Sequence, residues 1–348
     1  MESLKEIYYG YSEFYGEHYY KWEHAQSKRY FEYREVWEKS AEAHTRTKFP
    51  LHLDIGITNV CNLKCTFCAR TILVDEGKFR KAQHMDFDLY KKIIDQATKL
   101  GTYSVNLNLL NEPLSNPKLI EMIRYAKESG IIDVHFHSHG GLLTEEKSRE
   151  LIESGLDKLL VSIDTYDKEK YNKLRVMSNH DDVVNNLKKF KQIRDEMGKI
   201  GPLVRTNFIQ FPGISKEDLR KNIDFGLTIS DCVGLQMWVD PTLTIGKDKS
   251  YSNDYKSSFV CPQPFTRLCI IEDGTVSPCC VDYSQNLAVG NINEKSLLDI
   301  WESDEMENIR KHMTDGKFYE IDTCKNCEIA TNSDEGILAP SEKFGPTI

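Results

Sequence analysis

The sequence predicts an α/β protein in which six strand–helix units build a parallel sheet that curls into a partial (β/α)6 barrel of the TIM type. Two observations lead to this prediction: strand-like apolar runs recur between residues 51 and 240, and helical patterns separate them. Such units place helices outside a parallel sheet, and ligands bind where the strands end. The strand-like runs are Leu51–Ile57, Tyr103–Leu109, Ile132–His137, Lys158–Ile163, Leu203–Ile209 and Gly234–Val239.

The helical patterns between these runs have recognisable ends. Gly101, Gly130 and Gly155 stand where helix C-caps are expected. Asn116, which precedes a proline, and Thr144 are the expected helix starts. The helical patterns lie near residues 86–100, 116–129, 144–154, 181–199 and 215–229.

Residues 1–50 form an aromatic-rich extension that we expect to be helical. We interpret its aromatic faces as packing the extension onto the barrel, while a lid or a dimer contact are alternatives that the sequence leaves open. The oligomeric state is not predicted. The aromatic faces consist of Tyr15, Tyr19 and Trp22, and of Phe31, Tyr33 and Trp37.

The composition is that of a soluble protein. The 348 residues are 40% hydrophobic and 28% charged, with a formal net charge of −9, so nucleic acid and anionic membranes are not expected partners. No apolar run approaches the ~20 residues of a membrane span, and the N-terminal residues do not resemble a secretion signal. We therefore expect a cytoplasmic protein with reduced thiols, in which ten cysteines argue for metal ligation rather than disulfides.

Three cysteines follow the first strand-like run at the spacing CxxxCxxC: Cys61, Cys65 and Cys68. Three thiolates at this spacing can hold three irons of a [4Fe–4S] cluster and leave the fourth iron without a protein ligand. Clusters that only carry electrons usually have four protein ligands, so an open iron predicts that a substrate or cosubstrate binds there. Zinc is the alternative, but it prefers four ligands in paired arms, and this run has no local fourth cysteine.

Residues 259–330 form a second predicted unit, which holds six of the ten cysteines. A linker over residues 241–258 precedes it, and an irregular tail over residues 331–348 follows it. The segment from Cys269 to Cys279 is predicted to be a β-hairpin that turns at residues 272–274. The six cysteines are Cys261, Cys269, Cys279, Cys280, Cys324 and Cys327.

This combination of motifs resembles the radical S-adenosylmethionine (SAM) enzymes and, within them, the subfamily with a SPASM or shorter "twitch" domain. The CxxxCxxC run carries the first resemblance; the cysteine pattern after residue 260, with Gly290 and Trp301, carries the second. In this family the open iron chelates SAM, and an electron from the cluster cleaves it to a 5′-deoxyadenosyl radical. The resemblance implies SAM and two [4Fe–4S] clusters, one of them auxiliary.

The resemblance also implies which residues contact these cofactors. A zinc site built from the same auxiliary ligands stays open, as does replacement of one ligand by Cys269 or Cys280. The auxiliary ligands implied are Cys261, Cys279, Cys324 and Cys327. The SAM contacts implied are Phe67, Asn111, Glu112, Ser138, His139, Ser162, Asp164 and Arg175.

Three histidines, His135, His137 and His139, alternate along one predicted strand and therefore face one side of the sheet. We interpret them as a polar lining rather than a metal site. Asn207 and Trp238 are further candidates for the lining of the barrel mouth.

The predicted function is abstraction of a hydrogen atom from a small polar substrate, such as a sugar, an aminocyclitol or a nucleotide sugar, followed by oxidation with electron transfer to the auxiliary cluster. Asp282 is the candidate proton acceptor, with turn capping as the alternative role. Epimerisation, with Cys232 or Cys280 as hydrogen donor, and peptide or protein maturation are alternative reactions. An iron–sulfur electron carrier is the non-enzymatic alternative, and a flavodoxin or ferredoxin is the expected electron donor.

Overall fold

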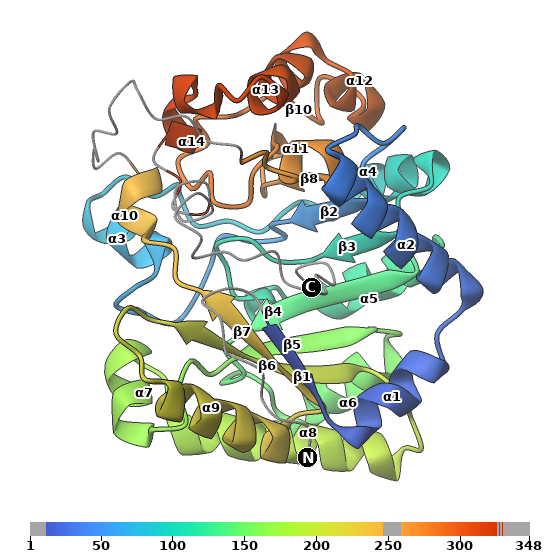
Figure 1. Ribbon diagram of the computed structural model, residues 1–348. Helices are drawn as coiled ribbons and strands as arrows, with labels where there is room; N and C mark the ends of the chain where they lie inside the picture. The colour runs from blue at the N-terminus through green and yellow to red at the C-terminus, as the bar shows by residue number, and fades with distance from the viewer. Residues whose placement is uncertain (1–11, 246–258, 326, 328, 330–348) are drawn as a thin grey trace.

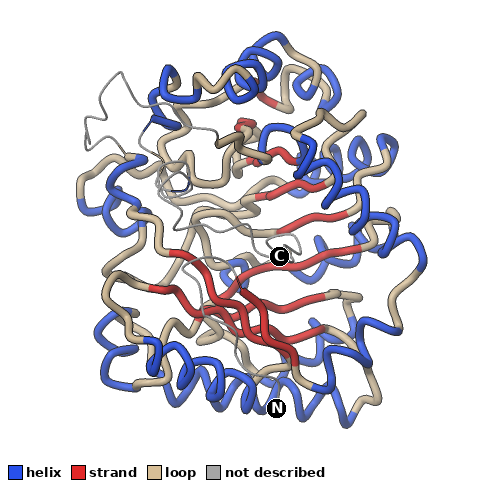
Figure 2. The backbone as a smooth tube through the Cα atoms, viewed as in Figure 1, coloured by secondary structure: helices blue, strands red, loops and turns tan. Residues whose placement is uncertain are grey.

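A computed structural model describes residues 12–245, 259–325, 327 and 329. In these residues one ten-stranded sheet runs through the whole molecule, in the order β1-β7-β6-β5-β4-β3-β2-β8-β9-β10. The six central strands are parallel, and helices cover their outer side (Figures 1 and 2). The α/β partial barrel with a small C-terminal domain is confirmed, and its sheet stays open.

The six central strands lie at the six predicted runs. They are β2 (His52–Ile55), β3 (Ser104–Asn106), β4 (Asp133–Ser138), β5 (Lys158–Ser162), β6 (Leu203–Gln210) and β7 (Cys232–Met237). The helices between them are α4 (Phe87–Leu100), α5 (Leu119–Glu128), α6 (Glu145–Glu153), α8 (His180–Glu196) and α9 (Lys216–Ile229).

The helix ends bear out some of the sequence signals and correct others. Gly101 adopts the left-handed conformation at the C-cap of α4, and the Thr144 side chain caps α6. Asn116 is not the N-cap of α5, because Lys118 holds that position. The Asn116 side chain instead accepts a hydrogen bond from the Lys118 backbone N–H. Three short helices were not predicted because each is too brief for a periodic apolar pattern: α3 (Ala69–Asp75), η1 (Pro113–Ser115) and α7 (Lys168–Leu174).

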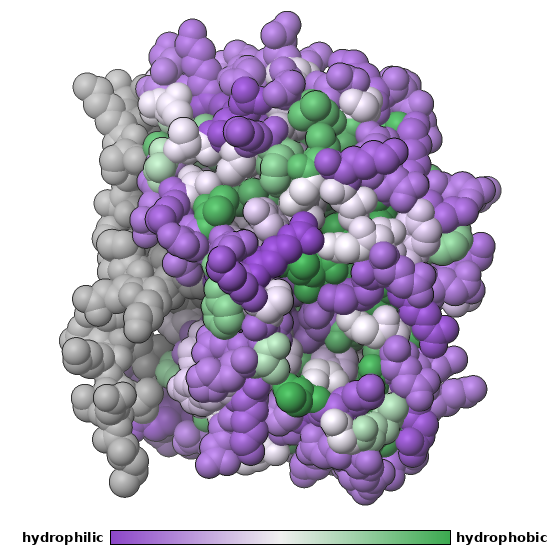
Figure 3. Space-filling view, turned by 90° about the vertical axis from the view of Figure 1, so that its right-hand side faces the viewer, coloured by the Kyte–Doolittle hydropathy of each residue, from purple (hydrophilic) through white to green (hydrophobic). Residues whose placement is uncertain are grey.

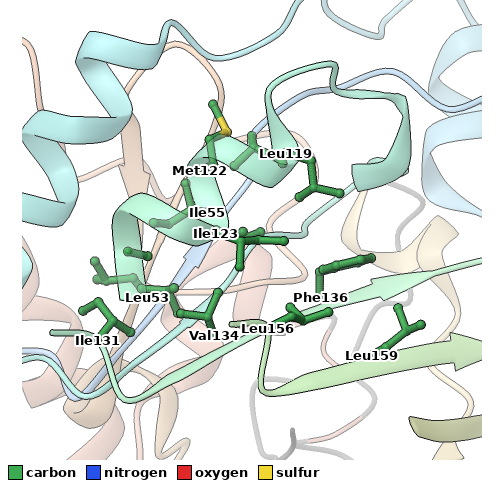
Figure 4. Close-up of a cluster of buried hydrophobic side chains, with 14 of the residues drawn as sticks. Leu53, Ile55, Leu119, Met122, Ile123, Ile131, Val134, Phe136, Leu156 and Leu159 are labelled. Atoms are coloured by element: carbon green, nitrogen blue, oxygen red, sulfur yellow. The ribbon is translucent and has the colours of Figure 1, made fainter. Parts of the chain in front are cut away.

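The central strands separate an apolar layer from a polar one. Leu53, Ile55, Val134, Phe136 and Leu159 point outward and pack against the covering helices (Figure 4). The alternate residues of the same strands face the concave side, and many of them are polar or charged. The core that holds the barrel together is therefore outside the sheet, and the concave side is left for chemistry.

The N-terminal extension packs against the end of the barrel where the strands begin (Figure 1). Its helices are α1 (Glu17–His24) and α2 (Lys28–Ala43), and Trp22, Tyr33 and Trp37 are buried. Packing of the aromatic faces onto the barrel is thus confirmed.

Two details of the extension differ from the prediction. The segment around Tyr15 is not helical but forms β1 (Ser12–Tyr15), which pairs antiparallel with β7. On α2 Tyr30 is buried together with Tyr33 and Trp37, whereas Phe31 is 45% exposed. Tyr30 and Phe31 are adjacent aromatic residues, so the sequence did not show which of the two lies on the buried face of the helix.

The C-terminal unit continues the sheet of the barrel. Strand β8 (Arg267–Ile270) pairs parallel with β2, and the predicted hairpin to β9 (Thr275–Ser277) is present, with Gly274 at φ +89° in its turn. The other elements of this unit are β10 (Gly290–Asn291), α11 (Gln263–Thr266), α12 (Leu297–Trp301), α13 (Asp304–Thr314), η2 (Phe318–Glu320) and α14 (Asp322–Lys325).

The predicted linker begins with α10 (Pro241–Thr244). Residues 246–258 of that linker and the predicted tail 331–348 lie outside the described residues. Among the described helices, none is both long enough and apolar enough to cross a membrane. Hydrophilic residues cover most of the face shown in Figure 3, and hydrophobic residues form only small patches there.

Replacing Tyr33 by Ala should destabilise the protein by about 3 kcal/mol, because a buried aromatic ring that stacks on Tyr103 at 5.2 Å is lost. Phe31→Ala on the same helix should change stability by less than about 0.5 kcal/mol, since its ring is largely exposed. Denaturant unfolding followed by circular dichroism measures both. Equal losses would contradict the placement of the extension.

Candidate functional site

The CxxxCxxC loop lies at the barrel mouth, directly after β2. Its backbone is fixed by the segment after α7: the Lys64 N–H donates to the Val176 carbonyl at 3.1 Å, and the Thr66 N–H donates to the Leu174 carbonyl at 2.9 Å. Cys68 is the N-cap residue of α3. The loop is therefore held from two sides before any cofactor binds.

The three thiols of this loop lie close enough to influence one another's ionisation. The pKa of Cys65 is raised to about 11, mainly by burial, with Arg175 opposing the rise and the neighbouring Cys68 and Cys61 thiols adding to it. Burial also raises the pKa of Cys61. Without a metal the Cys61 and Cys65 thiols stay protonated at neutral pH, whereas iron binding would stabilise their thiolates.

Glu112 is the hub of the neighbouring loops. Its buried carboxylate accepts hydrogen bonds from the Ser138 hydroxyl (2.9 Å), the His139 N–H (2.9 Å) and the Leu114 N–H (3.1 Å). Its own N–H donates to the Val60 carbonyl at 2.9 Å, next to Cys61. Glu112 thus connects the loops after β2, β3 and β4, and its oxygens are already engaged by the protein.

His139 connects the CxxxCxxC loop to Glu112. Its Nδ1 accepts the Gly141 N–H at 2.9 Å, so the ring proton is on Nε2. That Nε2 lies 2.8 Å from the Asn62 Oδ1 and 3.3 Å from the Glu112 carboxylate. Burial lowers the pKa of His139, so a neutral donor is expected at pH 7. This geometry makes His139 a positioning residue for the cysteine loop.

Arg175 and Asp164 form a buried ion pair on the other side of the mouth. The Arg175 guanidinium contacts the Asp164 carboxylate at 2.6 and 2.7 Å and lies 5.6 Å from the centre of the Phe67 ring. Asp164 has φ +65° and follows β5, which ends at Ser162. Arg175 therefore orients Asp164 and the aromatic side chain of the cysteine loop.

Two buried polar atoms at the mouth have no hydrogen-bond partner within the described residues: Asn111 Nδ2, a donor, and Asp164 Oδ1, an acceptor. Both belong to the residues that the family resemblance assigns to SAM. SAM offers a carboxylate that accepts hydrogen bonds, and an ammonium group and ribose hydroxyls that donate them. The residues present therefore fit this cofactor.

Four cysteines from three segments surround a small cavity in the C-terminal unit: Cys261, Cys279, Cys324 and Cys327. Phe259, Pro264, Leu287, Met313 and Phe318 are among the side chains that complete its apolar wall. These are the four predicted auxiliary ligands.

Cys269 and Cys280 do not line that cavity. The Cys269 thiol lies 3.6 Å from the Asp54 carboxylate, which also pairs with Arg267 at 3.2 Å. Burial and Asp54 raise the pKa of Cys280 to about 11, while Arg267 lowers it. The Cys269 thiol therefore lies toward the concave side of the barrel. The Cys280 thiol also interacts with the thiols of Cys261, Cys279 and Cys327, so its exchange with one of the four ligands stays an alternative.

The Asp282 side chain caps its own loop, which is the alternative role that the sequence left open. Its carboxylate accepts hydrogen bonds from the Ser277 hydroxyl (3.0 Å) and from the N–H groups of Asn286 and Leu287 (both 2.9 Å). All three partners belong to its own loop and the preceding strand, so a role as proton acceptor gains no support from this geometry.

Cys232 is not brought to the mouth. It is the first residue of β7, rather than a residue before it, and packs with Trp22, Tyr30 and Leu203 at the opposite end of the barrel. Burial raises its pKa. It is a small core residue in this position, and its use as a hydrogen donor gains no support.

The three alternating histidines have separate partners. His135 lies 3.6 Å from Asp133, and His137 lies 3.3 Å from the Asn207 side chain. Burial lowers the pKa of His135 to about 4 and that of His137 to about 3, so both are neutral at pH 7. They form a polar lining, as predicted.

Sequence reasoning did not identify Asn62 or Phe211. Phe211 lies at 5.3 Å from Phe67 and at 5.1 Å from Trp238, between ring centres, and the three rings form an aromatic wall of the mouth. Phe211 follows β6 directly. Its position directly after a predicted strand is the feature of the sequence that could have indicated a place at the barrel mouth.

Sequence models of two protein families match this chain. The model of the radical SAM superfamily matches residues 55–226, and the model of the SPASM iron–sulfur cluster-binding domain matches residues 261–328. The chain belongs to the radical SAM superfamily. The first match contains the CxxxCxxC loop and the second contains the four-cysteine cavity, so the resemblance seen in the motifs is confirmed.

Two curated relatives align with most of this chain. A tungsten-containing aldehyde ferredoxin oxidoreductase cofactor-modifying protein of Pyrococcus furiosus is 26% identical over 330 residues, which cover 80% of this chain and 87% of the relative. The S-adenosyl-L-methionine-dependent 2-deoxy-scyllo-inosamine dehydrogenase of Niallia circulans is 22% identical over 280 residues, which cover 79% of this chain and 91% of the relative.

Two solved structures share the fold of this radical SAM protein. BtrN in complex with AdoMet and 2-DOIA has a TM-score of 0.55 and 21% identity, over 81% of this chain and 94% of BtrN. Streptococcus suis SuiB bound to S-adenosylmethionine has a TM-score of 0.60 and 19% identity, over 89% of this chain and 79% of SuiB. The cofactors of this enzyme are therefore SAM and two [4Fe–4S] clusters. The assignment of individual cysteines to them stays a prediction.

Anaerobic reconstitution should yield about eight irons and eight sulfides per chain, from two four-iron clusters. Replacing Cys61, Cys65 and Cys68 together by Ala should leave about four of each, because the auxiliary cavity is untouched. Iron and sulfide analysis measures both. Full iron content in the triple variant would overturn the ligand assignment.

Glu112→Ala should raise the dissociation constant for SAM, because three loops at the mouth lose their common acceptor; we expect a cost of about 1–3 kcal/mol. Glu112→Gln should cost less, since its amide oxygen still accepts hydrogen bonds. Anaerobic equilibrium binding measures both variants, with the exposed Glu121→Ala as control. Unchanged affinity in Glu112→Ala would remove Glu112 from the site.

Proposed function

We propose that this radical SAM enzyme oxidises a small polar substrate such as a sugar, an aminocyclitol or a nucleotide sugar. When bound, SAM and its cluster supply a 5′-deoxyadenosyl radical that takes a hydrogen atom, and the auxiliary cluster accepts the electron that the substrate then loses with a proton. The observation that carries this proposal is the pairing of β8 with β2, because it joins the unit that holds the four-cysteine cavity to the strand that leads into the cysteine loop.

The residues of the mouth have separable tasks in this proposal. Asn111 and Asp164 offer the free donor and acceptor for SAM, while Glu112 and His139 hold the loops that present it. The aromatic wall of Phe67, Phe211 and Trp238 excludes water from one side. Neutral His137 and Asn207 lie below the mouth on the concave side, where they can hydrogen-bond substrate hydroxyls.

The dehydrogenase from Niallia circulans supports oxidation of a small polyhydroxylated ring, since it aligns with this chain over nearly its full length. A flavodoxin or ferredoxin is the electron donor that we propose for the SAM cluster. SAM cleavage after reduction by dithionite would separate this enzyme from a passive electron carrier.

A radical epimerase is the second candidate, and the placement of Cys280 and Cys269 favours it. The Cys269 thiol lies 3.6 Å from the Asp54 carboxylate on the concave side, and Asp54 and Arg267 both act on the pKa of Cys280. From there one thiol can return a hydrogen atom to a substrate radical.

Replacing Cys324 and Cys327 together by Ala should leave SAM cleavage but nearly abolish oxidised product, because the electron acceptor is lost while the SAM site is intact. The ratio of 5′-deoxyadenosine to oxidised product, measured by chromatography, should therefore rise strongly. The Cys232→Ala variant serves as the control and should keep the wild-type ratio. Normal product yield in the double variant would contradict the oxidation.

Deuterium tracing separates the two candidates. Oxidation yields a product without solvent deuterium at the reacting carbon, whereas a thiol donor exchanges with solvent and delivers deuterium to it. If Cys280→Ala and Cys269→Ala leave an oxidised product unchanged, the thiols are not donors. A redox-neutral product with deuterium at a stereocentre, lost in one of these variants, would replace oxidation by epimerisation.

A further inference from the structure

A buried charged contact joins the two cluster-bearing units at the barrel mouth. Glu272, in the turn between β8 and β9, is 3% exposed. Its Oε1 accepts hydrogen bonds from the Asn59 Nδ2 at 2.7 Å and from the Arg80 Nε at 2.8 Å, and its Oε2 accepts one from the Arg80 Nη2 at 3.2 Å. The bidentate geometry fixes both the distance and the orientation of the carboxylate.

Asn59, one of the two partners of Glu272, is tied to the cysteine loop. Asn59 lies two residues before Cys61, and its Oδ1 accepts the Gln83 N–H at 2.8 Å. The Asn59 carbonyl accepts a hydrogen bond from the Arg70 Nε at 3.0 Å, and Arg70 lies two residues after Cys68. Both ends of the CxxxCxxC loop are thereby connected to this one contact.

The Glu272 side of the contact leads to the auxiliary cavity. Glu272 lies in the hairpin whose second strand, β9, ends two residues before Cys279, one of the four cysteines around that cavity. A displacement of the hairpin turn relative to Asn59 would therefore move one cluster site relative to the other.

We propose that Glu272 is a positioning residue that sets the separation and orientation of the auxiliary cluster relative to the SAM cluster. The inference rests on the proposed function, in which an electron reaches the auxiliary cluster. A buried carboxylate without its partners is strongly unfavourable, so the contact has one good arrangement. The paired strands β2 and β8 fix the two units at their middle, and Glu272 fixes them at the mouth, beside the cysteine loop.

The test measures geometry rather than turnover. In the fully reconstituted and reduced protein, the spin–spin interaction between the two clusters, recorded by electron paramagnetic resonance, reports their distance and relative orientation. Glu272→Ala should broaden and shift this interaction, and Asn59→Ala should do the same. Glu272→Gln keeps one acceptor and should have a smaller effect. Glu294→Ala, an exposed carboxylate of the same unit, is the matched control and should leave the spectrum unchanged.

The product ratio gives a second readout. With the substrate, Glu272→Ala should release about tenfold more 5′-deoxyadenosine per oxidised product, because small misplacements of reacting groups cost large factors in rate. Iron content should stay that of the wild type. An unchanged spin–spin interaction in both Glu272→Ala and Asn59→Ala would overturn the inference, whereas a changed interaction in an enzyme that forms no oxidised product would overturn the proposed oxidation alone.

Discussion

The parallel pairing of β2 with β8 is the interaction on which the arrangement of both cluster sites depends. Four residue pairs, from His52 with Arg267 to Ile55 with Ile270, join the two units, and the Gly56 N–H extends the ladder to the Ile270 carbonyl at 2.8 Å. Because the strands are parallel, both carboxyl ends point to the same mouth. An antiparallel β8 would have carried the following turn, with Glu272, to the opposite end of the barrel and away from Asn59.

The concave side of the sheet pairs its buried charges one to one. Asp54 pairs with Arg267 at 3.2 Å, Asp133 with Lys158 at 2.8 Å, and Glu13 with Arg205 at 2.6 Å. Burial of an isolated charge is unfavourable by several kcal/mol, so each pair holds together the elements that supply it. The first pair joins the barrel to the C-terminal unit and the third joins it to β1. The ion pairs on the concave side thus also hold the C-terminal unit and β1 to the barrel.

The sequence was most informative where a motif determines local chemistry. The CxxxCxxC loop, the four auxiliary cysteines and the turn at Gly274 could be read from spacing, turn residues and family resemblance. Strand β1 could not, because four residues carry no periodic pattern and its pairing partner, β7, lies more than 200 positions away. The contact between Asn59 and Glu272 was invisible for the same reason: only the folded sheet brings residues 213 positions apart together.

Ionisable residues near a cysteine motif were the least predictable. Asp282 was chosen for its closeness to Cys279 in sequence, yet three donors from its own loop and the preceding strand satisfy its carboxylate. Arg175 was chosen as a carboxylate ligand, yet its guanidinium is already bound to Asp164. Sequence distance indicates which groups are neighbours, but it does not show which hydrogen-bonding capacity remains unused.

The environments of the two cysteine groups differ in a way that matches their proposed tasks. Apolar side chains such as Phe259 and Met313 surround the four auxiliary cysteines, and such a shell limits solvent access and tunes a reduction potential. The three-cysteine loop instead borders Asn111 and Asp164, each with an unused polar atom. A closed apolar cavity with four thiols suits electron storage, and an open polar mouth with three suits a cluster that must bind another molecule. The side chains around the two cysteine groups therefore fit the division of labour that we propose for the clusters.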